Sequence, residues 1–262
     1  MNEALKNTLL RAVHAGAKQL RKYFDGTFEI RSKDTINNLV TEVDQKSEEA
    51  IIDVIRSEYP EHFILSEEIG ELSTESSYKW IIDPIDGTVN FAHGIPICCV
   101  SIGLEKDGQL IMGVVFNPLM NELFFAERGK GAFLNNKPIR VSDNGSVERA
   151  CLVTGFPYRW VDVAADPIKV FERFIRMGLP VRRLGSAAID LCWVAAGRFD
   201  GFWEYNLNPW DLAAGYLIIE EAGGIVTNFK GEPYSVYDKQ TLATNNQIHA
   251  EMLKVINGEI DV

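Results

Sequence analysis

The chain has 262 residues, of which 46% are hydrophobic and 24% are charged, so it is long and apolar enough to bury a large core. Its formal net charge of -11 argues against nucleic acid and anionic membranes as partners. The N-terminus mixes charged and apolar side chains, and no stretch has the length of a transmembrane span, so we expect neither a signal peptide nor a membrane helix. An acidic protein that handles anionic substrates needs bound cations to reverse the local field.

The cysteines predict a reducing compartment. Cys98 and Cys99 are adjacent in an apolar stretch, and Cys151 and Cys192 lie in other apolar segments. Their spacing fits neither a metal site nor a redox motif, so we expect buried, reduced thiols. We therefore predict a cytoplasmic protein.

Residues 1–145 are expected to form an α+β half with an antiparallel sheet covered by two helices. Apolar residues at helical spacing predict an amphipathic helix over 3–24 and, after a connecting segment at 30–43, a second helix over 44–58. A charged turn that contains Asp107-Gly108 predicts a hairpin. Short apolar runs predict strands at 63–65, 80–82, 98–103, 110–116, 121–126 and 131–134.

Residues 146–262 are expected to form an α/β half, because helices and strands alternate after a polar seam at 142–149. The predicted strands of this half are 152–155, 181–184, 201–205, 225–227 and 241–244. The predicted helices are 167–177, 186–196, 208–221 and a terminal helix after residue 246.

A strand followed by two aspartates carries the strongest chemical signal. The run from Trp80 to Ile82 is apolar and typical of a buried strand. Because proline cannot donate to the ladder, Pro84 predicts that the strand ends where the carboxylates begin. Asp83 and Asp86 would then converge beyond the strand end, and convergent carboxylates repel unless a cation lies between them.

The next two residues suit an anion. Gly87 tolerates backbone angles closed to other residues, so Gly87-Thr88 can bring N–H groups and a hydroxyl against a phosphate. The alternative is an ordinary turn with two solvated aspartates, since Asp-Pro and Asp-Gly are common turn dipeptides.

Carboxylates stand at the ends of predicted elements in four separate places, which are Asp44, Glu67-Glu68, Asp83 with Asp86, and Asp211. Each has an ordinary structural explanation. Asp44 fits a helix cap, and Asp211 fits the first turn of a helix that Asn208-Pro209 begins. Together with the glycine-threonine cradle they match two hard cations bridged by a phosphate.

These residues resemble a known family. Asp83-Pro-Ile-Asp-Gly-Thr88 with Asn90-Phe91, and Trp210-Asp211-Leu-Ala-Ala-Gly215 followed by Glu221-Ala-Gly-Gly224, resemble the two signatures of the inositol monophosphatase family. The resemblance covers nearly the whole chain. It implies a layered α-β-α-β-α sandwich of the inositol monophosphatase and fructose-1,6-bisphosphatase type. It also implies two or three Mg²⁺ ions as cofactor, inhibition by Li⁺, and a homodimer.

The resemblance also implies metal ligands. The first Mg²⁺ would be held by Glu67, Asp83 and the backbone carbonyl of Ile85. The second would be held by Asp83, Asp86 and Asp211, so that Asp83 bridges the two ions.

Catalytic roles are carried over in the same way. Glu67 and Thr88 would position the attacking water, and Asp44 would orient the threonine hydroxyl. Lys33 would have a minor electrostatic role, against the alternative of a solvated surface lysine. Glu68, the second member of the acidic pair, is a further minor candidate.

The substrate contacts implied by the resemblance lie in three segments. Gly185-Ser186-Ala187 resembles the family's substrate-side loop, and Glu204 resembles its sugar-contacting glutamate, with a strand-end surface acid as the alternative. The full implied set is Asp86, Gly87, Thr88, Gly185, Ser186, Ala187, Glu204 and Asp211.

The implied reaction is hydrolysis of myo-inositol monophosphate, a small phosphorylated substrate, to inositol and phosphate. Fructose 1,6-bisphosphate, histidinol phosphate and adenosine 3',5'-bisphosphate stay open, because the metal site recognises only the phosphate. Arg182-Arg183 fits a solvated strand face, a partner interface or a contact to a second phosphate. A different class of function is regulatory binding to transcription machinery, against which the costly cluster of like charges argues.

Overall fold

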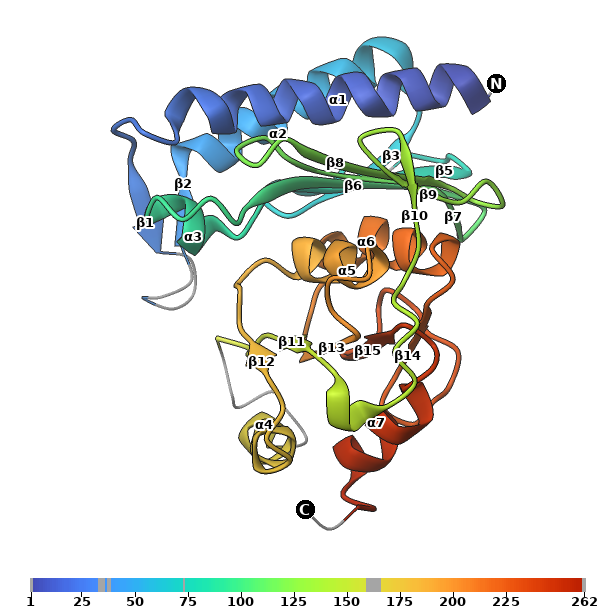
Figure 1. Ribbon diagram of the computed structural model, residues 1–262. Coiled ribbons are helices and arrows are strands. Elements are labelled where there is room, and N and C mark those ends of the chain that lie inside the picture. The colour runs from blue at the N-terminus through green and yellow to red at the C-terminus, as the bar shows by residue number, and fades with distance from the viewer. Residues whose placement is uncertain (1, 33–35, 37–38, 73, 159–165, 261–262) are drawn as a thin grey trace.

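The computed structural model describes residues 2–32, 36, 39–72, 74–158 and 166–260. Helices and sheets alternate in an α-β-α-β-α stack, with the N-terminus at one end and the C-terminus at the other (Figure 1). The layered sandwich predicted from the sequence is therefore confirmed. Lys33 lies outside the described residues. No described helix is both long enough and apolar enough to cross a bilayer.

The first layer consists of α1 (Asn2–Tyr23) and α2 (Glu42–Glu58). Both helices bury an apolar stripe against one face of the large sheet. The predicted start of α2 at Asp44 is two residues late, because Thr41 is the N-cap and Asp44 is its capping-box partner. The preceding segment is not a plain connection, since β1 (Ile30–Ser32) and β2 (Leu39–Thr41) pair antiparallel.

The large sheet has the strand order β10-β9-β8-β7-β6-β5-β3-β4. β3 and β5 run parallel, and the other neighbours pair antiparallel, so the predicted antiparallel sheet is in fact mixed. The predicted hairpin is formed by β6 and β7. The strands are β3 (Phe63–Ser66), β4 (Gly70–Leu72), β5 (Tyr78–Asp86), β6 (Cys99–Lys106), β7 (Gln109–Asn117), β8 (Glu122–Glu127), β9 (Ala132–Leu134) and β10 (Lys137–Ile139).

The end of β5 differs from the prediction. The strand continues past Pro84, because Asp83 pairs with Ser101 and Asp86 pairs with Cys99 with a register shift between them. Proline interrupts the ladder as a bulge here and does not terminate it. The bulge is fixed from α2, where Ser47 Oγ donates to the Pro84 carbonyl at 2.9 Å.

The middle layer consists of α5 (Ala187–Ala195) and α6 (Pro209–Glu221). These helices are apolar nearly all round because sheets lie on both sides of them (Figure 1). Close packing on β7 depends on Gly113, where a Cβ would lie 2.9 Å from the Ala214 Cα. One apolar cluster thus joins residues on both sides of the predicted boundary at 145/146, and that boundary stays a prediction.

The smaller sheet has the order β12-β11-β13-β15-β14 and completes the stack with α4 (Pro167–Arg176) and α7 (His249–Asn257) on its outer face (Figure 1). The alternation of helices and strands predicted for this half is confirmed. The strands are β11 (Leu152–Thr154), β12 (Val181–Arg182), β13 (Gly201–Tyr205), β14 (Ile225–Thr227) and β15 (Gln240–Thr244). The short elements are α3 (Thr88–Ala92) and a 3-10 turn (Val147–Arg149).

Candidate active site

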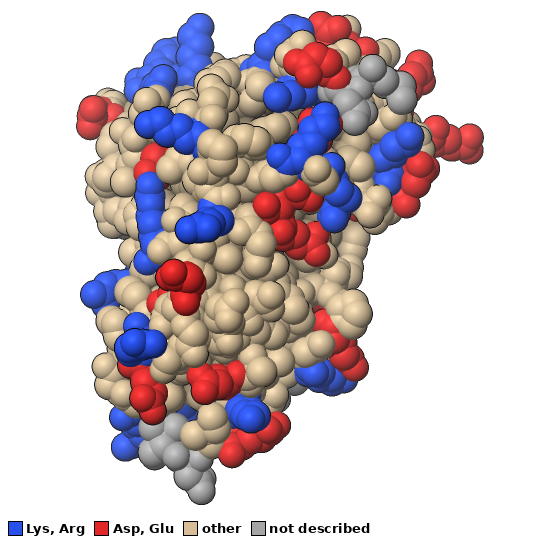
Figure 2. Space-filling view, turned by 45° about the vertical axis from the view of Figure 1, so that its right-hand side comes forward, with Lys and Arg blue, Asp and Glu red and all other residues tan. Residues whose placement is uncertain are grey.

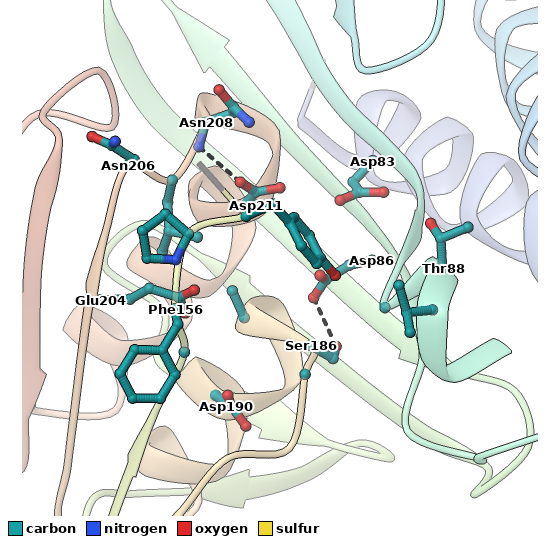
Figure 3. A pocket seen from close by; sticks show the side chains of 18 of the residues that line it. Asp83, Asp86, Thr88, Phe156, Ser186, Asp190, Glu204, Asn206, Asn208 and Asp211 are labelled. Atoms are coloured by element: carbon teal, nitrogen blue, oxygen red, sulfur yellow. Dashed lines mark hydrogen bonds between the residues drawn. The ribbon is translucent and has the colours of Figure 1, made fainter. Parts of the chain in front are cut away.

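A cavity of about 580 Å³ lies where the end of β5 faces the first turns of α5 and α6 (Figure 3). Most residues that sequence analysis assigned to the site line it. Asp44 and Glu68 are not part of the lining. Asp44 lies behind it, hydrogen-bonded to Thr88. The predicted residues in the lining are Glu67, Asp83, Ile85, Asp86, Gly87, Thr88, Gly185, Ser186, Ala187, Glu204 and Asp211.

The turn from β5 into α3 requires a glycine. Gly87 has a φ of 92°, in the left-handed region, and a Cβ there would lie 2.8 Å from the Ile97 carbonyl oxygen. Just before it, the Ile85 N–H donates to Asp83 Oδ1 at 3.0 Å. The chain therefore turns tightly at the cavity, and the backbone N–H of Ile85 holds the Asp83 carboxylate in place.

Thr88 and Asp44 form a hydrogen-bonded pair in which Asp44 is buried and Thr88 is half-buried. Thr88 Oγ1 lies 3.0 Å from both Asp44 Oδ1 and the Ile85 carbonyl, and it can donate its single proton to either. Asp44 Oδ2 accepts hydrogen bonds from the Thr41 N–H at 2.7 Å and from Thr41 Oγ1 at 2.6 Å. Burial raises the pKa of Asp44 to about 6, the charge of Glu67 adds to the rise, and the threonine donors oppose it. Asp44 is thus both a helix cap and the acceptor behind the Thr88 hydroxyl.

Asp86 is held by the start of α5. Ser186 Oγ donates to Asp86 Oδ2 at 2.7 Å, as Figure 3 shows, and the Ala188 N–H donates to the same oxygen at 2.6 Å. Burial raises the pKa of Asp86 to about 6 against the lowering effect of these donors, and the charge of Glu67 raises it further. Residues 100 positions apart in sequence therefore fix this carboxylate.

Asp211 stands in the first turn of α6, where its carboxylate accepts from the Asn208 N–H at 2.7 Å. Burial raises the pKa of Asp211 well above its usual range, and the charges of Glu67 and Asp86 raise it further. Asp211 therefore both stabilises the start of α6 and lines the cavity.

The donor set fits hard divalent cations. Candidate ligand carboxylates from three segments line one cavity, which are Glu67, Asp83 with Asp86, and Asp211. The charge of Glu67 raises the pKa of Asp44, Asp86 and Asp211. A bound cation would relieve this repulsion. As the side chains lie, no three Asp, Glu, His or Cys residues in the described part of the chain meet as a finished metal cage.

The opposite end of the cavity contains Glu204 on β13 and a residue that sequence analysis missed, Asp190 on α5 (Figure 3). The Glu204 carboxylate lies against Gly155, where a Cβ would come within 2.2 Å of both its oxygens. Burial raises the pKa of Glu204 to about 8, and the charge of Arg183 opposes the rise. The signal for Asp190 was its place as the one acid in the apolar segment 186–196.

The arginine pair is divided between two environments. Both arginines are exposed, but only Arg183 lines the cavity. Arg182 lies on β12 and donates to the Val181 carbonyl at 3.3 Å. Lys239 is a second cation in the lining. On the face seen in Figure 2, basic and acidic side chains of the described residues are interspersed and form no continuous basic patch.

Comparison with known sequences gives relatives over most of the chain. A protein of Synechocystis named inositol-1-monophosphatase is 43% identical over 246 residues, which are 94% of this chain and 86% of that protein. A protein of Thermotoga maritima named fructose-1,6-bisphosphatase/inositol-1-monophosphatase is 40% identical and covers 88% of each chain. The Nus factor SuhB of Escherichia coli is 40% identical over 97% of this chain and 96% of its own length.

Solved structures agree with these relatives. The crystal structure of the extragenic suppressor protein suhB from Bartonella henselae superimposes with a TM-score of 0.92 and 36% identity, over 98% of this chain and 100% of that one. The layered fold and the acidic cavity are those of a metal-dependent phosphatase. The sequence model of the inositol monophosphatase family matches residues 1–260, and the chain belongs to that family.

Proposed function

We propose that the chain is a Mg²⁺-dependent phosphomonoesterase that hydrolyses an inositol monophosphate in this cavity. The observation that carries the proposal is the gathering of Glu67, Asp83, Asp86 and Asp211 in one cavity, beside the Thr88–Asp44 hydrogen bond. Two or three Mg²⁺ ions held by these carboxylates and the Ile85 carbonyl would lower the pKa of water and neutralise phosphate charge.

The chain's own residues would hold and deprotonate the attacking water. Thr88 Oγ1 accepts from that water, with Glu67 as the second acceptor in the same wall of the cavity. The threonine proton passes to Asp44 Oδ1, which lies 3.0 Å away. Because burial raises the pKa of Asp44 to about 6, this carboxylate takes up a proton more readily near neutral pH than an exposed aspartate does.

Phosphate and alcohol would be held by different segments. The N–H groups of Gly87 and Thr88 donate to phosphate oxygens as charge shifts among them. The loop from Gly185 to Ala187 and Glu204 meet the hydroxyl groups of the leaving alcohol. The deprotonated water then attacks phosphorus in line as the ester P–O bond breaks, and no covalent phosphoenzyme is required. The leaving alkoxide takes up a proton from solvent, and Asp44 returns its proton to solvent through Thr88.

A phosphate-release screen tests the proposal. Inositol, sugar and nucleotide phosphate esters are incubated with the protein, with and without Mg²⁺ and Li⁺. We expect Mg²⁺-dependent release that is fastest with inositol 1-phosphate and is inhibited by Li⁺. Equal rates with Mg²⁺ and with excess chelator would contradict the metal assignment. Lithium sensitivity, a homodimer and a cytoplasmic location all stay predictions.

Two relatives favour alternatives. The name of the Thermotoga maritima relative favours fructose 1,6-bisphosphate as a further substrate, and Arg183 in the cavity lining could meet its second phosphate. The name of the Escherichia coli relative favours regulatory binding to transcription machinery. Capture of polymerase components independently of Mg²⁺, together with negligible hydrolysis of every ester, would establish that second function and exclude the phosphatase.

A further inference from the structure

Glu48 is a buried glutamate that the mechanism above does not use. It lies in the first half of α2, it is 2% exposed, and it does not line the cavity. Its Oε1 accepts hydrogen bonds from Ser66 Oγ, from the Glu68 N–H at 3.1 Å and from the Ile69 N–H at 3.3 Å. Burying a carboxylate is costly unless it is hydrogen-bonded, and these donors offset that cost. The contact ties α2 to the turn that follows β3.

Glu67 stands in the middle of that turn and is held from both sides. Its own N–H donates to the Ile82 carbonyl at 3.2 Å, which continues the parallel pairing of β3 with β5. The next two N–H groups along the chain donate to Glu48. Because Glu67 lines the cavity, fixing its backbone limits where its carboxylate can lie.

Ser47, the preceding residue of α2, makes the corresponding contact to the end of β5. It is fully buried, and its Oγ donates to the Pro84 carbonyl at 2.9 Å, between Asp83 and Ile85. α1 packs directly over this contact, since a Cβ at Gly16 would lie 2.8 Å from Ser47 Oγ. Two successive residues of one helix therefore hold the turn after β3 and the bulge in β5.

The two proposed cation positions are supported by different helices. The segments held by α2 supply the proposed ligands of the first cation, which are Glu67, Asp83 and the Ile85 carbonyl. Asp86 and Asp211, proposed for the second cation, are held instead by the start of α5 and the start of α6. In Figure 1, α2 lies on one face of the large sheet, and α5 and α6 lie on the other. The fold can therefore set the two affinities separately.

We propose that Glu48 and Ser47 are positioning residues that set the affinity of the first cation position, Glu48 through Glu67 and Ser47 through the bulge. This inference rests on the proposed metal-dependent function and deepens it. Replacing a residue that orients a metal ligand without touching the ion typically lowers metal affinity by about 10- to 100-fold. The charge of Glu48 should be dispensable, because an amide oxygen can accept the same hydrogen bonds.

The test measures Mn²⁺ binding by electron paramagnetic resonance in wild type, Glu48→Ala, Glu48→Gln and Ser47→Ala. We expect Glu48→Ala and Ser47→Ala to weaken the binding of one Mn²⁺ ion by about tenfold or more, and Glu48→Gln to stay within about threefold of wild type. In crystals soaked with Mn²⁺, the anomalous peak beside Glu67 should weaken in Glu48→Ala, whereas the peak beside Asp211 should persist.

Glu49→Ala is the matched control, because it makes the same charge change at the adjacent, exposed position of α2 and should bind Mn²⁺ as wild type does. The melting temperature of each metal-free variant is measured beside its Mn²⁺ affinity. A lower melting temperature of Glu48→Ala with unchanged Mn²⁺ affinity would overturn the inference, since a purely structural residue has that effect. Equal losses of affinity in Glu48→Gln and Glu48→Ala would overturn it too, because the charge would then be the cause.

Ser47→Ala removes a single oxygen atom and keeps the inference testable if Glu48→Ala does not fold. Mn²⁺ affinity unchanged in Ser47→Ala would then overturn the inference. Either negative result leaves the proposed function standing as long as wild type binds Mn²⁺ in the cavity. Wild type that binds no Mn²⁺ there would refute the proposed metal site and this inference with it.

Discussion

The two ends of the cavity treat buried carboxylates differently. At the end formed by β5 and α3, protein donors hold the acids in place, as the bonds from Ser186 and Ala188 to Asp86 and from Thr41 to Asp44 illustrate. At the other end, Asp190 Oδ1 has no partner in the described chain. The first end is preorganised by hydrogen bonds from the fold, whereas the second end leaves a buried carboxylate oxygen without such a bond.

This difference matches the chemistry of a phosphate ester. The phosphate and its cations are common to all substrates, so their ligands can be fixed in advance. The alcohol varies between substrates, so the residues that meet it need not be fixed in the same way. Changes at the two ends should therefore have different effects, in both size and kind.

Asp86→Asn should have the largest effect. The change removes one charge from the cation end while keeping the shape, so we expect kcat/KM to fall by about 10³-fold for every ester and metal affinity to fall with it. Steady-state kinetics and Mn²⁺ titration measure the two losses. Asp53→Asn on the exposed face of α2 makes the same charge change outside the cavity and should behave as wild type. Wild-type turnover in Asp86→Asn would remove the two-metal assignment.

Thr88→Val should have the next largest effect. It removes the hydroxyl that joins the cavity to Asp44, so we expect kcat to fall by about 10²-fold. Thr88→Ser keeps the hydroxyl and should recover most of that loss. The proposed proton path is wrong if the serine and valine variants lose equal activity in the same assay.

His249 is a buried titratable side chain for which the fold supplies a hydrogen-bond partner at both ring nitrogens. Its ring nitrogens lie 2.9 Å from the hydroxyls of Thr227 and Thr244, and burial lowers its pKa from 6.5 to about 4. Because the unfolded chain binds a proton at a higher pH than the folded one, stability is complete above pH 6.5 and is lost as the pH falls toward 4. We expect the free energy of unfolding to drop by about 2 kcal/mol between pH 7 and pH 5 from this group.

Urea denaturation of wild type and His249→Gln at the two pH values measures that dependence. Asn substitution of the exposed His93 provides the control, because it removes a histidine at the surface and should keep the wild-type pH dependence. An equally steep dependence in His249→Gln would show that other groups cause the loss.

Gly155→Ala should have the smallest effect. It should act on the Glu204 end of the cavity and leave the cation end unchanged. The added methyl group would collide with the Glu204 carboxylate and displace it from the alcohol end. We expect the preference for inositol 1-phosphate over p-nitrophenyl phosphate to fall by about tenfold, mainly through KM. Glu204→Gln in the Gly155→Ala background should add little, because the carboxylate has already moved. If the two substitutions lowered the substrate preference additively, Gly155 and Glu204 would act independently, and this prediction would be wrong.

Much of this arrangement could be predicted from the sequence, because it follows local rules. The bounds of β13 were predicted as the structure has them, and the β6–β7 hairpin follows from its turn residues. The continuation of β5 through Pro84 could not be predicted, since it depends on the pairing of Asp86 with Cys99. Sequence rules treat proline as a strand end and do not reveal a bulge held by another strand.

The missed site residues have a similar cause. Asp190 lies in an apolar segment whose pattern predicts a buried helix but does not tell which turn faces a cavity. Arg182 and Arg183 are equivalent in sequence, and only the path of the chain after β12 turns one of them into the cavity. Motifs with fixed spacing could be recognised, whereas contacts made by the stacking of layers could not.

The most direct measurement is a crystal structure of the protein soaked with Mn²⁺ and phosphate, with the ions located by anomalous scattering. The account predicts at least two Mn²⁺ peaks in the cavity, bound by Glu67, Asp83, Asp86 and Asp211, with a phosphate bridging them beside Gly87. Mn²⁺ bound elsewhere on the protein, or a phosphate seated in the cavity without any cation, would contradict it.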